Sequence, residues 1–237
     1  MTTWGFSAPR KVKSTMTFSI LARDETGALG QAVSSSSPAV AARCLNLRCD
    51  IGAVSSQNIT DPRFGPALLD QLEKGETAVA ALKWLETKDD TLDFRQITIL
   101  PARGEGVSHS GAKTLGTHSQ VVGKDCVIAG NMLASEDVPQ KMLEVFESVA
   151  GDLEYRLLAA MKAGLEAGGE AGPVHSAGLG VVRNSGWMET DLRVDWSERP
   201  LTDLENLLEI WMPQRDDYVT RGINPSTAPA YGVPGDE

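Results

Sequence analysis

The 237-residue sequence lacks several features that would place a protein in a broad functional class. It has no apolar run near the roughly 20 residues that a helix needs to span a bilayer. Residues 1–16 lack the apolar core of a secretory signal peptide. It also lacks a surplus of basic residues, because it has 22 Lys and Arg and 32 Asp and Glu. The resulting net charge of −10 opposes binding to a phosphate backbone. We therefore expect a cytoplasmic protein with no membrane and no nucleic-acid partner.

Cysteine is scarce, and three residues cannot form a complete set of disulfides. Their spacing matches no closely paired zinc motif, so buried free thiols are the simplest interpretation of Cys44, Cys49 and Cys126. Only three histidines occur. A zinc site would require the fold to bring His109, His118 and His175 together with Cys126, and solvated or hydrogen-bonded histidines are the ordinary alternative. We expect neither a metal nor an organic cofactor.

The pattern of apolar residues predicts strands and helices in alternating groups. Alternation of apolar and polar residues begins at Thr17, and further strands are predicted at 30–35, 50–57, 95–100, 106–110, 118–122, 125–129, 176–183 and 190–194. Helical spacing predicts one helix pair within 66–85, a second within 135–165, and a last helix at 204–211. Strand groups separated by helix pairs, rather than regular β-α-β units, predict an α+β fold with two stacked sheets.

Three segments differ in composition. Residues 1–16 are a short polar extension, which we interpret as a mis-assigned start or a removed segment. Residues 17–221 form the folded domain, and 222–237 are a tail rich in Pro and Gly. Nothing in the sequence marks an oligomer interface, although homo-oligomerisation suits a two-sheet protein of this size.

Thr17 is the first candidate for chemistry. A threonine hydroxyl is a weak nucleophile, but an N-terminal threonine carries its own general base, because an α-amine titrates near pKa 8. This requires Met16 to be removed, either by initiation at Met16 followed by trimming or by cleavage before Thr17. The alternative is that Thr17 is an ordinary strand residue.

Two pairs of residues follow apolar strands and could contact a substrate. Gly130 would let the backbone approach a ligand while the Asn131 amide stabilises an oxyanion, although Gly-Asn is also ordinary turn chemistry. Gln57 and Asn58 could orient a substrate amide, or could simply cap the end of their strand.

Hydroxyl and charged groups supply the remaining candidates. Ser35 lies in the serine run 34–37, where a hydroxyl could relay a proton beside Thr17, and surface serines are the alternative. Asp24 and Arg193 are charged residues near strand ends. Arg193 could grip a substrate carboxylate, or could complete a structural ion-pair network with the neighbouring aspartates.

Seven blocks of sequence resemble an uncharacterised bacterial family whose members open with Thr-Phe-Ser-Ile-(Val/Leu)-Ala-Arg-Asp. The blocks are TFSILARD from residue 17, GQAVSSSSPAV from 30, IGAVSSQN from 51, DPRFGPALLDQL from 61, VIAGNML from 127, HSAGLGVV from 175 and DLRVD from 191. The ending NPSTAPAYGVPGDE is also similar to that of the family, which implies that the tail packs on the domain. The resemblance covers residues 16–237 in order, and the first fifteen residues lie outside it.

The resembled family is assigned to the N-terminal-nucleophile (Ntn) hydrolases. This implies a four-layer αββα sandwich of two stacked antiparallel sheets, and hydrolysis of an amide through an acyl-enzyme on Thr17. Ser176 matches a serine of the family, and we expect it to bind substrate. The chain departs from the family at Ser36, where a Lys or Arg is frequent, and at His175, where Gln is usual.

We therefore expect an amidohydrolase that cleaves a small amide or peptide-like substrate through Thr17. Two alternatives remain open. The fold could have lost catalysis and serve as a ligand-binding or scaffold protein, since fold does not dictate function. The histidines could instead support a metal-dependent hydrolase.

Overall fold

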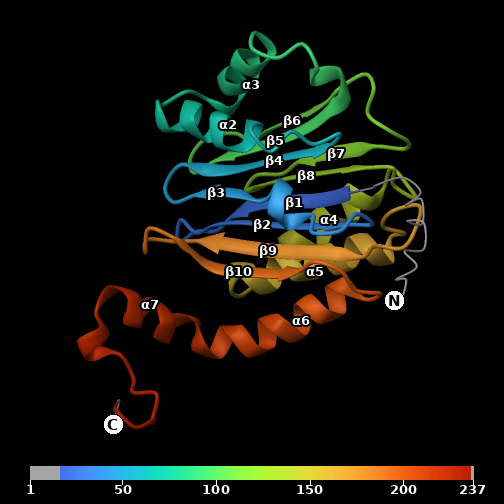
Figure 1. Cartoon of the computed structure of the whole chain (residues 1–237). Coiled ribbons are helices and arrows are strands. Elements are labelled where there is room, and N and C mark those ends of the chain that lie inside the picture. The colour runs from blue at the N-terminus through green and yellow to red at the C-terminus, as the bar shows by residue number, and fades with distance from the viewer. Residues whose placement is uncertain (1–16, 236–237) are drawn as a thin grey trace, which may run out of the picture.

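The computed structural model describes residues 17–235 and contains two antiparallel sheets with helices against both (Figure 1). The larger sheet has the strand order β10-β9-β2-β1-β8-β7. Its strands are β1 (Thr17–Arg23), β2 (Leu29–Ser35), β7 (Ser119–Val122), β8 (Cys126–Asn131), β9 (Ser176–Val182) and β10 (Met188–Val194). The smaller sheet has the order β3-β4-β5-β6. Its strands are β3 (Asn46–Arg48), β4 (Gly52–Asn58), β5 (Arg95–Pro101) and β6 (Val107–Ser110).

Helices occupy the outer side of each sheet and the connection between them. The described α-helices are α1 (Ala41–Cys44), α2 (Phe64–Glu73), α3 (Ala78–Glu86), α4 (Val138–Ser148), α5 (Leu153–Glu166), α6 (Pro200–Trp211) and α7 (Arg215–Ile223). Short 3-10 turns lie at Leu92–Phe94, Met212–Gln214 and Pro225–Thr227. Helix α3 begins where the Thr77 hydroxyl accepts a hydrogen bond from the Ala80 N–H, which satisfies one of the unpaired amides at the helix start.

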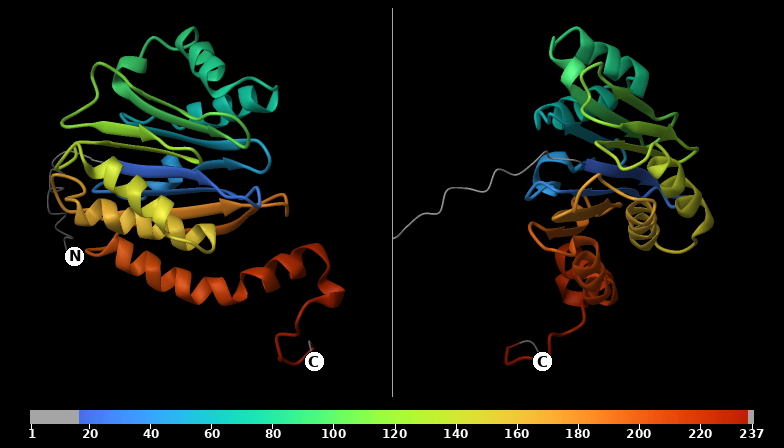
Figure 2. Two further views of the ribbon diagram at one scale, coloured as in Figure 1. Left: turned by 180° about the vertical axis from the view of Figure 1, so that it is seen from behind. Right: turned by 90° about the vertical axis from the view of Figure 1, so that its right-hand side faces the viewer.

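Each sheet buries its outer face under its own helices. On the larger sheet, Phe18, Ile20 and Ile128 pack against apolar residues of α4, α5 and α6 in one core cluster. On the smaller sheet, Ile97 and Ile99 pack against α2 and α3 in a second cluster. Alternate residues of each strand therefore face the helices, and the others face the opposite sheet. Figure 2 shows the two sheets lying between these helix groups.

The layer between the sheets is apolar at one end and polar at the other. Leu21, Ala53, Leu100 and Val127 form a small buried cluster at the apolar end. Toward the start of β1, the residues in the same layer become polar, and Gln57 is fully buried there. Because a buried polar group must be hydrogen-bonded, this end of the interface needs a closed network, whereas the other end packs by contact alone.

The predicted α+β class and the two stacked sheets are confirmed, and each predicted strand corresponds to an observed one. One observed strand and two α-helices were not predicted. Strand β3 and helix α1 are only three and four residues long, so neither leaves a periodic pattern. Helix α7 has no buried residue and therefore no apolar stripe.

The last described residues contact α7. The Arg221 guanidinium donates to the carbonyl of Pro229 at 3.0 Å and lies 4.1 Å from the ring centroid of Tyr231. Figure 2 shows this segment beyond the end of α7, away from the two sheets.

Leu157 on α5 tests the larger core. Its side chain is fully buried against the sheet, so we expect Leu157→Ala to lower the free energy of unfolding by about 2–5 kcal/mol through lost burial and a cavity. Urea denaturation measures the change. Leu165→Ala is the matched control on the same helix, because Leu165 is 42% exposed and should cost less than about 1 kcal/mol. Equal effects of the two substitutions would contradict this assignment of the core.

Candidate active site

Four of the sequence-predicted residues form one row across the larger sheet. In the strand register, Ser176 pairs with Ser35, Ser35 pairs with Thr17, and Thr17 pairs with Asn131. Directly paired residues of antiparallel strands point to the same side of the sheet. Thr17 shares its side with Ser19, which donates to a residue of the other sheet, so this polar row faces the layer between the sheets.

A chain of hydrogen bonds connects Thr17 to a cation. The Thr17 hydroxyl donates to Ser35 Oγ at 3.3 Å, and Ser35 Oγ lies 2.8 Å from Ser37 Oγ. Ser37 Oγ in turn accepts from Arg43 Nη2 at 2.8 Å. Thr17 is 6% exposed, so its hydroxyl is buried but reaches a pocket. The arrangement orients the Thr17 hydroxyl and connects it through two serine hydroxyls to a positive charge.

Thr17 lies on the wall of a pocket of about 430 Å³, which we call the Thr17 pocket. The residues that line it are Thr17, Ser37, Pro38, Val40, Arg43, Cys44, Asn58, Ile59 and Thr60. A pocket of this size suits a small molecule. Cys44 is no competing nucleophile, because burial raises the pKa of its thiol to about 11.

Backbone strain is concentrated around this pocket. Outside glycine, four residues in the described range have positive φ, and three of them surround Thr17. Asn58 (φ 68°) lines the pocket, Ala39 (φ 52°) lies between two lining residues, and Met132 (φ 48°) follows the row residue Asn131. Left-handed backbone is uncommon for Ala and Met, and such outliers cluster at functional sites.

Two glutamines of the smaller sheet hold the polar row from behind. Gln57 Oε1 accepts from Ser19 Oγ at 2.7 Å, and Gln57 Nε2 donates to Gln96 Oε1 at 2.7 Å. Asn131 Nδ2 donates to the same Gln96 oxygen at 3.1 Å, and Gln96 Nε2 donates to the Gly130 carbonyl at 3.1 Å. These bonds cross from one sheet to the other and fix the Asn131 side chain.

Asn131 has an unusual unsatisfied atom. Its side chain is fully buried, and its Oδ1 has no hydrogen-bond partner among the described residues. A buried acceptor without a donor costs about 1–3 kcal/mol. An amine or amide N–H brought to this position would therefore be stabilised.

Ser176, at one end of the row, and the remaining sequence-predicted residues of this region make contacts of their own. Ser176 Oγ donates to the Ser37 carbonyl at 2.5 Å and accepts from the Val40 N–H, so it shapes the loop beside the pocket. Asn58 donates to the Phe94 carbonyl at 2.6 Å. Gly130 faces Leu133, whose side chain would meet an added Cβ at 2.6 Å, so its missing side chain permits close packing there.

The structure does not bring Asp24 or Arg193 to the polar row. Asp24 lies just after the far end of β1, where its Oδ1 accepts from Thr26 Oγ1 at 2.6 Å in a tight turn. Arg193 on β10 forms a half-exposed ion pair with Asp191 at 2.7 Å. This contact matches the second interpretation of Arg193, in which it forms a structural ion pair with a neighbouring aspartate.

A buried carboxyl group that the sequence did not reveal lies next to the row. Both Glu170 oxygens accept from the Ser36 N–H at 3.1 Å, and Glu170 forms a β-bridge with Leu133. Since Ser36 follows the partner of Thr17 on one flanking strand, and Leu133 lies just past its partner on the other, Glu170 lies between the flanking strands one step beyond Thr17. Two Gly or Ala residues flank Glu170 on each side, so the sequence around it has no periodic pattern that would mark a buried position.

Burial controls the charge of Glu170. The side chain forms no ion pair within residues 17–235, and its burial raises the pKa of the carboxyl from 4.5 to about 8. Perturbed carboxyl groups in buried sites are candidates for acid–base chemistry.

The histidines do not converge. His175 stacks on Trp196 with ring centroids 4.4 Å apart, His109 lies 3.4 Å from the Leu92 carbonyl, and His118 contacts the carbonyl of Gly116. Over residues 17–235, no group of three or more His, Cys, Asp or Glu side chains is placed to hold a metal ion. Within that range, no helix combines the length and apolarity needed to cross a membrane.

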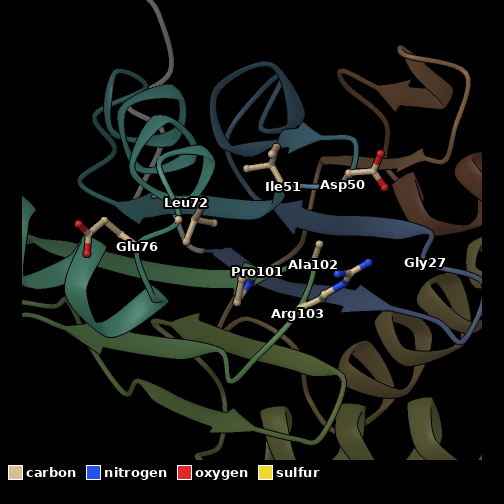
Figure 3. A pocket seen from close by; sticks show the side chains of 9 residues that line it. Gly27, Asp50, Ile51, Leu72, Glu76, Pro101, Ala102 and Arg103 are labelled. Atoms are coloured by element: carbon tan, nitrogen blue, oxygen red, sulfur yellow. The ribbon is translucent and has the colours of Figure 1, made fainter.

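A larger pocket, of about 620 Å³, lies at the opposite end of the sheets (Figure 3). It is lined by Gly27, Asp50, Ile51, Leu72, Gly75, Glu76, Pro101, Ala102 and Arg103. This lining contains no Ser, Thr, Cys or His, and Figure 3 shows the carboxylates of Asp50 and Glu76 far apart on its two sides. Its residues supply no hydroxyl or thiol nucleophile for amide hydrolysis, so the Thr17 pocket is the better candidate for that chemistry.

Glu170 yields a test of pH-dependent stability. The folded chain holds the Glu170 proton up to about pH 8, whereas an unfolded carboxyl releases it near its ordinary pKa of 4.5. The free energy of unfolding should therefore fall as the pH rises between these values. Glu170→Gln has no carboxyl to titrate, so we expect it to lose this pH dependence. Between pH 5 and pH 8.5, its free energy of unfolding relative to the parent should rise by at least about 1.4 kcal/mol, the value of one pKa unit.

Urea denaturation of the 237-residue chain at the two pH values measures the difference. Glu166→Gln, an exposed position on α5, is the control and should follow the parent at both pH values. An unchanged difference between Glu170→Gln and the parent across this range would show that Glu170 titrates normally.

Comparisons with known proteins agree with the fold. The model of a family of unknown function, DUF1028, matches residues 17–204. The crystal structure of protein SPO2555 from Silicibacter pomeroyi, also assigned to DUF1028, is 27% identical, with a TM-score of 0.80 over 87% of this chain and 94% of that chain. No curated protein matches the chain. The match to the family model spans most of the sequence, and the chain therefore belongs to the DUF1028 family.

Proposed function

We propose that the protein is an amidohydrolase of the N-terminal-nucleophile type, with Thr17 as its nucleophile. One observation carries this proposal: the first residue of a central strand is a threonine that is flanked by Ser35 and Asn131 and opens into a pocket. The two stacked sheets with outer helices support the further inference that the fold is the four-layer αββα sandwich of that superfamily. Fold similarity alone would not support an activity, whereas the residues of the site do.

The reaction begins with a free α-amine on Thr17, which requires removal of Met16. The amine takes the hydroxyl proton as Thr17 Oγ attacks the amide carbon and forms a tetrahedral intermediate. The C–N bond then breaks, and the leaving nitrogen takes that proton, which leaves an acyl ester on Thr17. Water attacks the ester, gives one proton back to Thr17 Oγ, and releases the carboxylic acid.

Asn131 is the proposed oxyanion donor. One hydrogen of its Nδ2 is used by Gln96, which fixes the side chain, and the second hydrogen can serve the developing negative charge. Its Oδ1, which has no hydrogen-bond partner within residues 17–235, suits the N–H of a bound amide or the α-amine of Thr17. Gly130 supports this position by letting Leu133 pack closely behind it.

Glu170 is the proposed partner of the α-amine. It lies between the flanking strands one step beyond Thr17, where a free amino group would project. Burial raises the pKa of this carboxyl toward the range in which an α-amine titrates, so the two groups are suited to exchange a proton. Glu170 differs from the Lys or Arg that is frequent at position 36 in the resembled family, because a carboxyl can accept or donate a proton but supplies no positive charge.

Thr17 provides the test of the proposed function. In a chain whose first residue is Thr17, we expect Thr17→Ala to lower hydrolysis of small N-acyl p-nitroanilides by at least about 1,000-fold, because nucleophile removal abolishes the covalent route. Thr17→Ser should retain measurable turnover. Intact mass after a brief incubation should reveal the added acyl group on the parent and not on Thr17→Ala.

Thr26→Ala is the matched control, because Thr26 is exposed in the turn at the far end of β1. Hydrolysis that survives Thr17→Ala would remove Thr17 from the mechanism. Ligand binding without turnover in the chain that begins at Thr17 would instead favour the ligand-binding or scaffold alternative.

A further inference from the structure

We propose that Arg43 binds a carboxylate group of the ligand in the Thr17 pocket, so that the substrate is an amide that carries an anionic group. The substrate part of this inference rests on the proposed function, whereas the anion site does not. The sequence predicted only a small amide or peptide-like substrate, and Arg43 adds a negative charge to that description.

Charge in the Thr17 pocket has one sign. Arg43 is the only charged residue among the nine that line it, and the other lining residues are apolar, hydroxyl, thiol or amide groups. Such surroundings are unusual for a cation in a chain of net charge −10. An anionic ligand would be repelled by most of the molecule and attracted here.

Arg43 lacks a carboxylate partner, which six other arginines of the described range have. Within residues 17–235, it forms no salt bridge, whereas Arg23, Arg48, Arg63, Arg183, Arg193 and Arg215 each pair with Asp or Glu. Its Nη1 donates to the carbonyls of Pro38 and Ala39, at 2.8 and 3.1 Å, and its Nη2 donates to Ser37. All three acceptors are formally neutral, so the positive charge is held in place without being neutralised.

The unused donors of Arg43 suit a carboxylate. A guanidinium has five N–H groups, and three are used by these acceptors. The Nε–H and one Nη2–H have no partner among the described residues. Two donors on one planar group match the two oxygens of a carboxylate in a bidentate pair.

The position of Arg43 relates the anionic group to the reacting bond. Arg43 and Thr17 line the same pocket and are connected through Ser37 and Ser35. A ligand carboxylate on Arg43 would therefore hold the amide carbonyl at a fixed spacing from Thr17 Oγ. Binding energy at the anionic end would be used to orient the scissile bond.

The kinetic test uses the chain that begins at Thr17 and compares two substrates. Glutaryl p-nitroanilide carries a carboxylate, and glutaramyl p-nitroanilide is its neutral counterpart, in which a primary amide replaces the carboxylate. Succinyl and adipoyl homologues of both cover shorter and longer spacings. We expect Arg43→Gln to lower the ratio of kcat/KM for the anionic over the neutral compound by about 10- to 100-fold, the range for a charge-assisted hydrogen bond. Arg43→Lys should recover part of the ratio, and Arg48→Gln, outside the pocket, should leave it unchanged. A ratio that does not change with Arg43→Gln would overturn the inference.

A binding test separates this inference from the proposed function. Glutarate is titrated by calorimetry into the Thr17→Ala chain, with and without Arg43→Gln, and thermal unfolding checks that both remain folded. Glutarate binding that is lost with Arg43 supports the anion site even if no amide is hydrolysed. Binding that is absent, or equal with and without Arg43, overturns the anion site even if Thr17 proves to be a nucleophile.

Discussion

The buried polar contact between the two sheets is the constraint on which the candidate site depends. Gln57 and Gln96 belong to the smaller sheet, yet their amides bond to Ser19, Asn131 and the backbone of the larger one. A buried amide with a missing partner would cost more than an apolar contact of the same size gains, so these bonds hold the sheets in a single register. An all-apolar interface would allow small sliding movements, but this network does not.

The same constraint divides the molecule into an end that packs and an end that can react. At the apolar end, Leu21 and Leu100 meet between the sheets, and at the other end the layer terminates in Thr17 and Asn131. The helices outside the sheets contribute most of the apolar burial and leave the polar end open to the Thr17 pocket. A strained backbone at Ala39, Asn58 and Met132 surrounds that opening, and the rigid sheets behind it can hold such strain.

Much of this arrangement could be predicted from the sequence. Periodicity predicted the strands and the helix pairs, because long amphipathic segments leave a clear pattern. The candidates Thr17, Ser35, Asn131 and Ser176 were chosen separately, from N-terminal chemistry, a serine run, a Gly-Asn pair and a family resemblance, and the strand register brings them into one row.

The rest could not be predicted, for physical reasons. The roles of Glu170 and Arg43 depend on what surrounds each side chain in three dimensions. Among the described residues, Glu170 is buried without a cation partner and Arg43 has no carboxylate partner. Neither condition has a local sequence signature. Asp24 and Arg193 were predicted as site residues because they are charged and lie near strand ends. A strand has two ends, however, and Asp24 lies at the opposite end of β1 from Thr17, while Arg193 pairs with Asp191.

Catalysis by Thr17 depends above all on a free α-amine at that residue. The most direct measurement is the intact mass and N-terminal sequence of the protein made in its native host, beside recombinant chains begun at Met1 and at Met16. We expect the native chain to begin at Thr17 and the chain begun at Met16 to be trimmed to the same residue. A native chain that keeps Met1 or Thr2 as its first residue would contradict catalysis by Thr17, because an acylated nitrogen on Thr17 cannot act as a base.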